Sequence, residues 1–223
     1  IYGSEAMAGV VNIITKSGTQ PKTANLGFRH RSFNSWNPFV ELGIQQKDWQ
    51  VDVLYDYFQT DGFDLTPEVV GQTQNPYQAQ TAQVKVRRQL SDKFELSLFG
   101  RGYIENASGE MEVNSNSPEA SRITMENSLR DWNFNPTLRF KPNENWLFSL
   151  RGMSSWYTTL ADSRYQRSGE SFDFQNFNQF YHRTELQTDY QANGNNLFTL
   201  GLGQITETVE ATRYEGENRF DTG

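Results

Sequence analysis

Apolar and polar residues alternate over several short stretches of this chain, and this alternation is the main guide to its fold. In the segment 49–57, one side of an extended strand would carry Trp49, Val51, Val53, Tyr55 and Tyr57. The positions between them are mostly polar. Strands are predicted in the same way at 82–90, 131–140 and 146–151, and further strands at 23–32, 39–46, 94–105, 177–190 and 197–207. The sequence therefore predicts about nine strands, most of them with one apolar face and one polar face.

Short polar turns recur between these strands at a nearly constant spacing. They lie at residues 47–48, 91–93, 142–145 and 193–195. Each interval holds two predicted strands and one longer polar connection, a repeat that is typical of the hairpins in an antiparallel up-and-down barrel. An aromatic residue follows each turn. We predict that these four residues form a girdle at a membrane interface; they are Trp49, Phe94, Trp146 and Phe198.

Longer polar connections separate the hairpins at the other side. They are predicted at 33–37, 61–78, 106–127 and 161–176, and from about residue 211 onward. Many predicted strands exceed the roughly 9 to 11 residues that cross a bilayer at a tilt, so we expect their outer ends to project beyond the membrane. Pro136 interrupts the pattern of 131–140, because proline lacks the N–H donor of the ladder, and it predicts either a bulge or a different register.

The composition is compatible with a membrane barrel despite its polarity. Hydrophobic residues make up 35% of the chain and the mean hydropathy is -0.74, values that also suit a soluble or partly disordered protein. A barrel has a low mean hydropathy because only alternate residues face lipid. The aromatic content of 14% argues against disorder and is sufficient for girdles at two membrane interfaces. The prediction is an all-β, antiparallel up-and-down transmembrane β-barrel, and a soluble β-sandwich that binds carbohydrate is the alternative fold.

Charge and reactive residues exclude several functions. The formal net charge of -7 argues against nucleic acid as a partner, because phosphate binding requires a basic surface. The chain has no cysteine, which excludes thiolate catalysis and cysteine zinc sites. Its two histidines, His30 and His182, lie in predicted strands, and no HExxH or GxSxG motif is present. We therefore predict neither an enzyme nor a resident cofactor.

One predicted connection contains a candidate ligand-binding group. At the exit of a strand, the sequence combines two carboxylates, a glycine and an aromatic ring, and the candidates are Asp61, Phe63 and Asp64. Loops on a rigid scaffold often bind ligands, and calcium takes several carboxylate oxygens. A solvated turn uses the same residue types and is favoured here, because a full set of calcium ligands is lacking. The sequence does not identify a metal.

The N-terminal segment has the most specific pattern in the chain. Residues 1–16 read IYGSEAMAGVVNIITK: a Tyr-Gly turn, small residues and then a β-branched run. This segment resembles the end of the plug domain of TonB-dependent outer-membrane receptors, in which similar residues lead from the plug to the barrel. The residues that carry the resemblance are Tyr2, Gly3, Gly9 and Asn12. Ala8 departs from the family, which usually has glycine at this position.

The resemblance implies a fold and a function. Residues 1–18 would be the C-terminal end of a plug domain, and residues 19–223 the N-terminal and incomplete part of a large barrel in the bacterial outer membrane. The motif is similar to that of receptors that import cobalamin or catecholate siderophores. The implied partners are outer-membrane lipid, a small ligand such as an iron chelate or cobalamin, and the inner-membrane TonB complex, which would act through a segment further N-terminal. The alternative function is a passive porin, or a structural or adhesion barrel, without energised transport.

Overall fold

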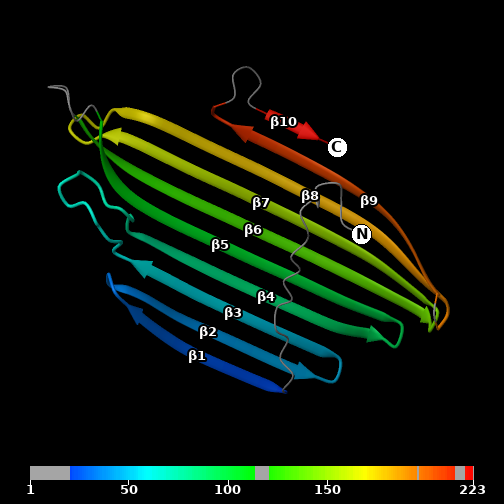
Figure 1. Ribbon diagram of the computed structural model, residues 1–223. Helices are drawn as coiled ribbons and strands as arrows, with labels where there is room; N and C mark the ends of the chain where they lie inside the picture. Colours follow the sequence, from blue (N-terminus) through cyan, green and yellow to red (C-terminus); the bar gives the residue numbers. More distant parts are fainter. Residues whose placement is uncertain (1–20, 114–120, 195, 214–218, 223) are drawn as a thin grey trace.

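The described residues form one antiparallel β-sheet (Figure 1). The computed structural model describes residues 21–113, 121–194, 196–213 and 219–222. Neighbours in the chain are neighbours in the sheet throughout, from the first strand to the tenth. The strands are β1 (Lys22–Arg31), β2 (Ser35–Gln46), β3 (Trp49–Thr60), β4 (Tyr77–Ser91), β5 (Phe94–Val113), β6 (Ser121–Asn143), β7 (Trp146–Tyr165), β8 (Ser171–Asn193), β9 (Asn196–Ala211) and β10 (Arg219–Thr222). Within this part of the chain, no helix has the length and apolar character needed to cross a membrane.

The nine predicted strands correspond to β1 through β9, and their up-and-down order is confirmed. The tight turns also lie where the sequence places them: residues 47–48 join β2 to β3, 92–93 join β4 to β5, and 144–145 join β6 to β7. These turns gather at one end of the sheet and the longer connections at the other (Figure 1). The short β10, which pairs with β9, is not predicted from the sequence.

Three predicted connections are wrong, because most of their residues belong to strands; in the one predicted at 33–37, β2 already begins at Ser35. The connection predicted at 106–127 contains the end of β5 and the start of β6, and that predicted at 161–176 contains the end of β7 and the start of β8. These four strands have 20, 23, 20 and 23 residues. Apolar and polar residues still alternate there, but in β5 and β6 the apolar ones, such as Met111 and Ile123, lie on the polar face instead of the apolar face. Continuous pairing with the neighbouring strand, as between Glu110 and Thr124, satisfies their backbone groups.

The register gives the sheet two chemically different faces. Residues that lie opposite one another on neighbouring strands point to the same side, and one such row consists of Leu42, Val53, Val84 and Gly100 across β2 to β5. The rows on either side of it point the other way and are largely polar. We call the side that carries Val53 the apolar face, and the opposite side the polar face.

Pro136 fits this register without the bulge or register change that the sequence predicts. It lies opposite Leu98 of β5, and the β6–β7 register continues unchanged from Phe134 to Thr137. On the β7 side the neighbour is Gly152, where an added Cβ would lie 3.0 Å from the proline Cγ. The glycine on the next strand therefore leaves space for the proline ring. The missing N–H donor affects hydrogen bonding only locally and does not shift the register of the strands.

The sheet is a single layer without a conventional hydrophobic core. Among the described side chains, the buried apolar ones are Ala79 and Ile123, whereas many large apolar side chains are exposed. β1 and β10 form the two edges, so the sheet made by the described residues is open. An apolar face of this extent requires a second apolar layer or an apolar solvent to cover it.

The all-β, antiparallel, up-and-down architecture is thus confirmed for the described residues. The predicted plug end at 1–18 lies outside the described residues. The same is true of the positions assigned to its motif, Tyr2, Gly3, Gly9 and Asn12.

Candidate functional site

The apolar face carries a continuous band of exposed hydrophobic side chains over the strand halves next to the tight turns. Val53 and Val84 lie near its centre, opposite each other on β3 and β4. Further exposed members extend the band from β1 to β9; they are Leu26, Phe28, Leu42, Ile44, Phe134, Leu150, Leu186, Leu200 and Leu202. Each Å² of such surface removed from water contributes about 25 cal/mol, so the band favours contact with an apolar phase.

The four aromatic residues that the sequence assigns to a girdle all lie on the apolar face near the tight turns. Trp49, Phe94 and Trp146 are the first residues of their strands, and Phe198 lies close to the start of β9. The Arg88 guanidinium covers the Trp49 ring, 4.4 Å from its centre. The structure therefore places these four side chains together at one end of the sheet; a membrane girdle stays a prediction.

Three further aromatic residues connect members of this first row. Phe140 stacks on Phe94 with ring centres 4.4 Å apart. Tyr190 contacts Trp146 at the same separation and lies opposite Phe198 in the register. Phe148 lies between these pairs; its ring centre is 6.0 Å from that of Phe140 and 5.7 Å from that of Trp146. From β5 to β9 the first row is thus an almost unbroken line of rings.

A second aromatic row crosses the apolar face farther from the tight turns. Trp36 packs against Tyr57 with ring centres 5.2 Å apart. Trp132 lies opposite Trp156, which in turn packs against Phe180 at 5.3 Å. All five tryptophans of the chain lie in these two rows on the apolar face. They are Trp49 and Trp146 in the first row, and Trp36, Trp132 and Trp156 in the second.

The separation of the two rows matches the apolar thickness of a membrane barrel. On β7, ten positions separate Trp146 from Trp156, and on β3 eight separate Trp49 from Tyr57. At about 3.4 Å per residue these intervals are roughly 27 to 34 Å along the strand. A tilt of about 45° reduces them to roughly 19 to 24 Å along the barrel axis. Outer-membrane barrels have an apolar band about 25 Å tall between two aromatic girdles.

The polar face carries charged pairs that span neighbouring strands. Glu95 of β5 bonds both Arg87 of β4 and Arg139 of β6, the latter at 3.0 Å. Two other cross-strand pairs have N···O distances of 2.9 Å; they are Arg101 with Asp131, and Arg151 with Glu185. The cations are substantially exposed, so each pair contributes little to stability. Such a surface suits water or a polar protein segment rather than lipid.

A small polar cluster interrupts the apolar band near its second row. Ser154 Oγ lies 2.8 Å from His182 Nδ1, and Thr184 Oγ1 lies 3.0 Å from His182 Nε2. These side chains satisfy one another, which lowers the free-energy cost of placing them against an apolar phase. Both histidines lie within strands, His182 in β8 and His30 in β1, as the sequence predicts.

The three candidate ligand-binding residues after β3 do not converge on a common point. Asp61 accepts a hydrogen bond from the Asn34 side chain at 2.9 Å, and the Phe63 ring packs on Phe33 with centres 5.1 Å apart. Asp64 accepts one from the backbone N–H two residues later, also at 2.9 Å. Each contact shapes the connection itself. Within the described part of the chain, no three His, Asp or Glu side chains are grouped to hold a metal ion.

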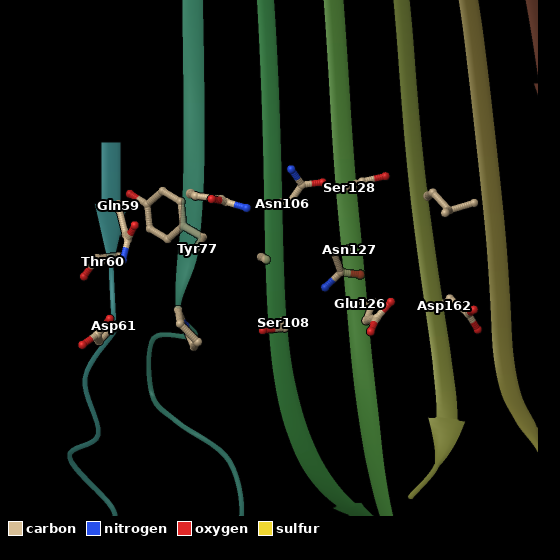
Figure 2. A pocket seen from close by; sticks show the side chains of 14 residues that line it. Gln59, Thr60, Asp61, Tyr77, Asn106, Ser108, Glu126, Asn127, Ser128 and Asp162 are labelled. Carbon is tan, nitrogen blue, oxygen red and sulfur yellow. The ribbon is translucent and has the colours of Figure 1, made fainter. Parts of the chain in front are cut away.

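Just beyond the second aromatic row, a groove of about 450 Å³ runs across β3 to β7 (Figure 2). Two rows of side chains line it on the same side of the sheet as the apolar band. The row nearer the band contains Gln59, Gln78, Asn106 and Ser128, which lie opposite one another in the register. The outer row contains Asp61, Ser108, Glu126 and Asp162. Of the sequence-predicted residues, the groove thus includes Asp61 but neither Phe63 nor Asp64.

Charged pairs also fix the outer strand ends around this groove. Arg164 donates two hydrogen bonds to Asp162, at 3.0 and 2.8 Å, and this contact raises the pKa of the guanidinium above its usual value. On β8, the pKa of the Asp173 carboxyl is lowered, first by the hydrogen bond from Gln175 and then by that from Arg213. The Asp173 carboxylate is therefore engaged in contacts that favour its charged form.

Sequence reasoning missed the residues of the second row and most of the groove. Asn106, Ser108, Glu126 and Asp162 all fall in stretches that the sequence assigns to connections. The only available signal was the aromatic content, which anticipated a second girdle without naming its members.

No protein-family model matches this chain. A functional assignment therefore depends on the arrangement of the two faces and on the resemblance of the N-terminal segment.

Proposed function

We propose that this chain forms part of a transmembrane β-barrel in a bacterial outer membrane, and that the barrel imports a scarce ligand by TonB-coupled active transport. The apolar face contacts lipid in this proposal, and the polar face lines the lumen. The observation that carries it is the exposed apolar band bounded by two aromatic rows that together hold all five tryptophans. Tryptophan and tyrosine are enriched at membrane–water interfaces in this way.

The strand lengths favour a barrel wall over a soluble sandwich. Strands of 20 to 23 residues are roughly 70 to 80 Å long at about 3.4 Å per residue, whereas strands of globular proteins have about 3 to 10 residues. The described sheet also lacks a second layer against its apolar face. In a barrel, one strand half crosses the bilayer and the other extends beyond it.

Energised import is supported by the resemblance of residues 1–18 to the end of a plug domain. A lumen filled by a plug excludes free diffusion, so a ligand passes only when the plug moves. Ferric siderophores and cobalamin are scarce and too large for small pores, and they are the ligand classes that the resemblance favours.

The test uses the full-length protein in detergent, titrated calorimetrically with cobalamin and with a panel of ferric siderophores. Calorimetry is preferable to intrinsic fluorescence, because the tryptophans of this chain lie on the face turned away from the lumen. Uptake of the ligand that binds is then measured in cells with and without TonB. We expect sub-micromolar binding of one ligand and loss of its uptake when TonB is absent.

Other results would identify the alternative functions. Uptake that persists without TonB and rises linearly with external concentration would indicate a passive porin. A barrel that assembles in the membrane but neither binds nor admits any of these ligands would indicate a structural or adhesion role. Either result would refute TonB-coupled import of these ligands.

A further inference from the structure

The groove beyond the second aromatic row lies outside the route that an imported ligand would take. Its two rows of side chains continue the apolar face, so they point away from the lumen. On β5 the apolar face ends at Ile104, and Asn106 and Ser108 follow it into the groove. On β3 the sequence passes from Tyr57, in the second row, to Gln59. The groove therefore begins where the apolar band ends, at the level expected for lipid headgroups.

Most side chains in the groove carry amide, hydroxyl or carboxylate groups, and the apolar ones are Pro76, Ala107 and Leu160. Asn106, Ser108 and Ser128 have no side-chain hydrogen-bond partner within the described ranges. Gln78 accepts one hydrogen bond, from the Tyr57 hydroxyl at 3.2 Å, so its NH₂ group remains able to donate. Amide groups both donate and accept, as hydroxyl groups do, and carboxylates accept from several donors. The groove thus offers both hydrogen-bonding roles within a few ångströms.

The charges of the groove restrict the class of ligand. Three carboxylates line it, on Asp61, Glu126 and Asp162; Asp162 is paired with Arg164, which is not among the lining residues, and neither lysine nor arginine lines the groove. Phosphate, sulfate and acidic sugars would be repelled by this arrangement. A bare divalent cation does not fit either, because no group of three ligating side chains occurs in the described part of the chain. A neutral, hydroxyl-rich molecule fits both the charge and the donor set, and about 450 Å³ lies within the range of small-ligand sites.

We propose that this outward-facing groove binds the hydroxyl groups of a neutral saccharide. The placement at headgroup level rests on the proposed barrel, whereas the chemistry of the groove does not. Two sources supply such a group: the sugar headgroup of a membrane glycolipid, and a free oligosaccharide outside the cell. Asn106 and Ser128 lie opposite each other at the centre of the inner row and bond the sugar hydroxyls.

The first experiment measures binding of a free saccharide. A fluorescently labelled core oligosaccharide, stripped of lipid and phosphate, is titrated by anisotropy against the full-length protein in detergent and in phospholipid nanodiscs. The test variant combines Asn106→Ala with Ser128→Ala. We expect about tenfold weaker binding, since two hydrogen bonds are lost at about 0.5–1.5 kcal/mol each and 1.4 kcal/mol corresponds to tenfold. Asn178→Ala is the matched control. Asn178 lies in β8, on the same face of the sheet as Asn106 and Ser128 but outside the groove.

The second experiment distinguishes the two sources. Nanodiscs of phosphatidylethanolamine with lipopolysaccharide are passed over a gel-filtration column, and the glycolipid retained per protein is quantified for the wild type and the two variants. Retention that falls in the double variant but not in Asn178→Ala assigns the groove to a glycolipid headgroup. Free oligosaccharide binding without such retention assigns it to a soluble saccharide. Both outcomes support the proposal.

Two outcomes would overturn the proposal. One is the absence of saturable oligosaccharide binding up to millimolar concentration. The other is equal weakening of oligosaccharide binding by the double variant and by Asn178→Ala. Failure of the full-length protein to enter nanodiscs would count against the proposed barrel instead. The detergent titration would still decide whether the groove binds saccharide, so the two failures are distinguishable. The substituted side chains are polar and not fully buried, and each variant is checked for wild-type electrophoretic heat modifiability before use.

Discussion

Two adjacent residues of β3 offer a sharp test of which face meets lipid. Val53 lies on the apolar face between Leu42 and Val84, whereas Leu54 lies on the polar face between Glu41 and Gln83. Both are apolar and half-buried. We compare Val53→Arg with Leu54→Arg, which introduce the same charge one residue apart on the same strand.

The position of Val53 sets the expected magnitude. It is four residues from Trp49 and four from Tyr57, which is about 14 Å along the strand or roughly 10 Å of depth from each aromatic row. The side chain is thus at the middle of the band, where arginine costs about 2–4 kcal/mol in a barrel. On the polar face, the Leu54→Arg guanidinium can approach Glu41, and we expect a change below about 1 kcal/mol.

The assay measures reversible unfolding of the full-length protein in phospholipid vesicles by titration with denaturant. The predicted difference of at least about 1 kcal/mol corresponds to a change of at least roughly fivefold in the folding equilibrium. Equal losses in the two variants, or a larger loss for Leu54→Arg, would refute the assignment of faces. Cooperative folding of the wild type in buffer without vesicles or detergent would refute the membrane barrel itself, because a soluble sandwich would bury the same face against protein.

Two other predictions follow from the tryptophan rows and from the connection after β3. In a full-length protein whose other tryptophans are replaced by phenylalanine, we expect lipids brominated near the headgroup to quench the fluorescence of these five tryptophans more strongly than lipids brominated near the acyl-chain end. Equal quenching by the two lipids would contradict the placement of the tryptophans in two rows. Gly62→Ala should accelerate hydrogen exchange in residues 61–76 without a change in global stability, because φ is +74° and a Cβ would lie 2.0 Å from the Gln74 carbonyl oxygen. Gly169→Ala is the control, since its φ is +73° but no atom lies within 4 Å; equal effects would mean that backbone strain alone is responsible.

The sequence predicted the half of each hairpin next to the tight turns because two signals coincide there. Alternation as in 49–57 marks the strand, and a short polar turn fixes where it begins. Beyond the second aromatic row the alternation changes face: in 106–113 the apolar residues Ala107, Met111 and Val113 alternate with polar ones and lie on the side of the sheet opposite Ile104. A search that follows one apolar face therefore stops at Ile104. The strand persists because its neighbours continue to supply backbone hydrogen bonds, which single-sequence patterns do not record.

The groove shows the same limit for a binding site. Its inner row combines Gln59, Gln78, Asn106 and Ser128, which are distributed over four strands and 70 residues of sequence. Only the register brings them together, and the sequence does not determine the register of strands whose apolar residues change face. Asp61 was recognised because a glycine and an aromatic ring stand beside it, yet the structure uses these neighbours to shape the connection.

The two faces also determine where ligand selectivity can reside in such a protein. Within the band, alternate positions are committed to the apolar phase, so a polar ligand contact there would carry a large solvation cost. The positions between them form the cross-strand pairs of Glu95, Arg101 and Arg151, which would point to the lumen of the proposed barrel. In that proposal, selectivity for an imported ligand belongs to the polar face and the outer connections. The groove lies outside both regions, so in the proposed barrel its chemistry can change without altering insertion or import.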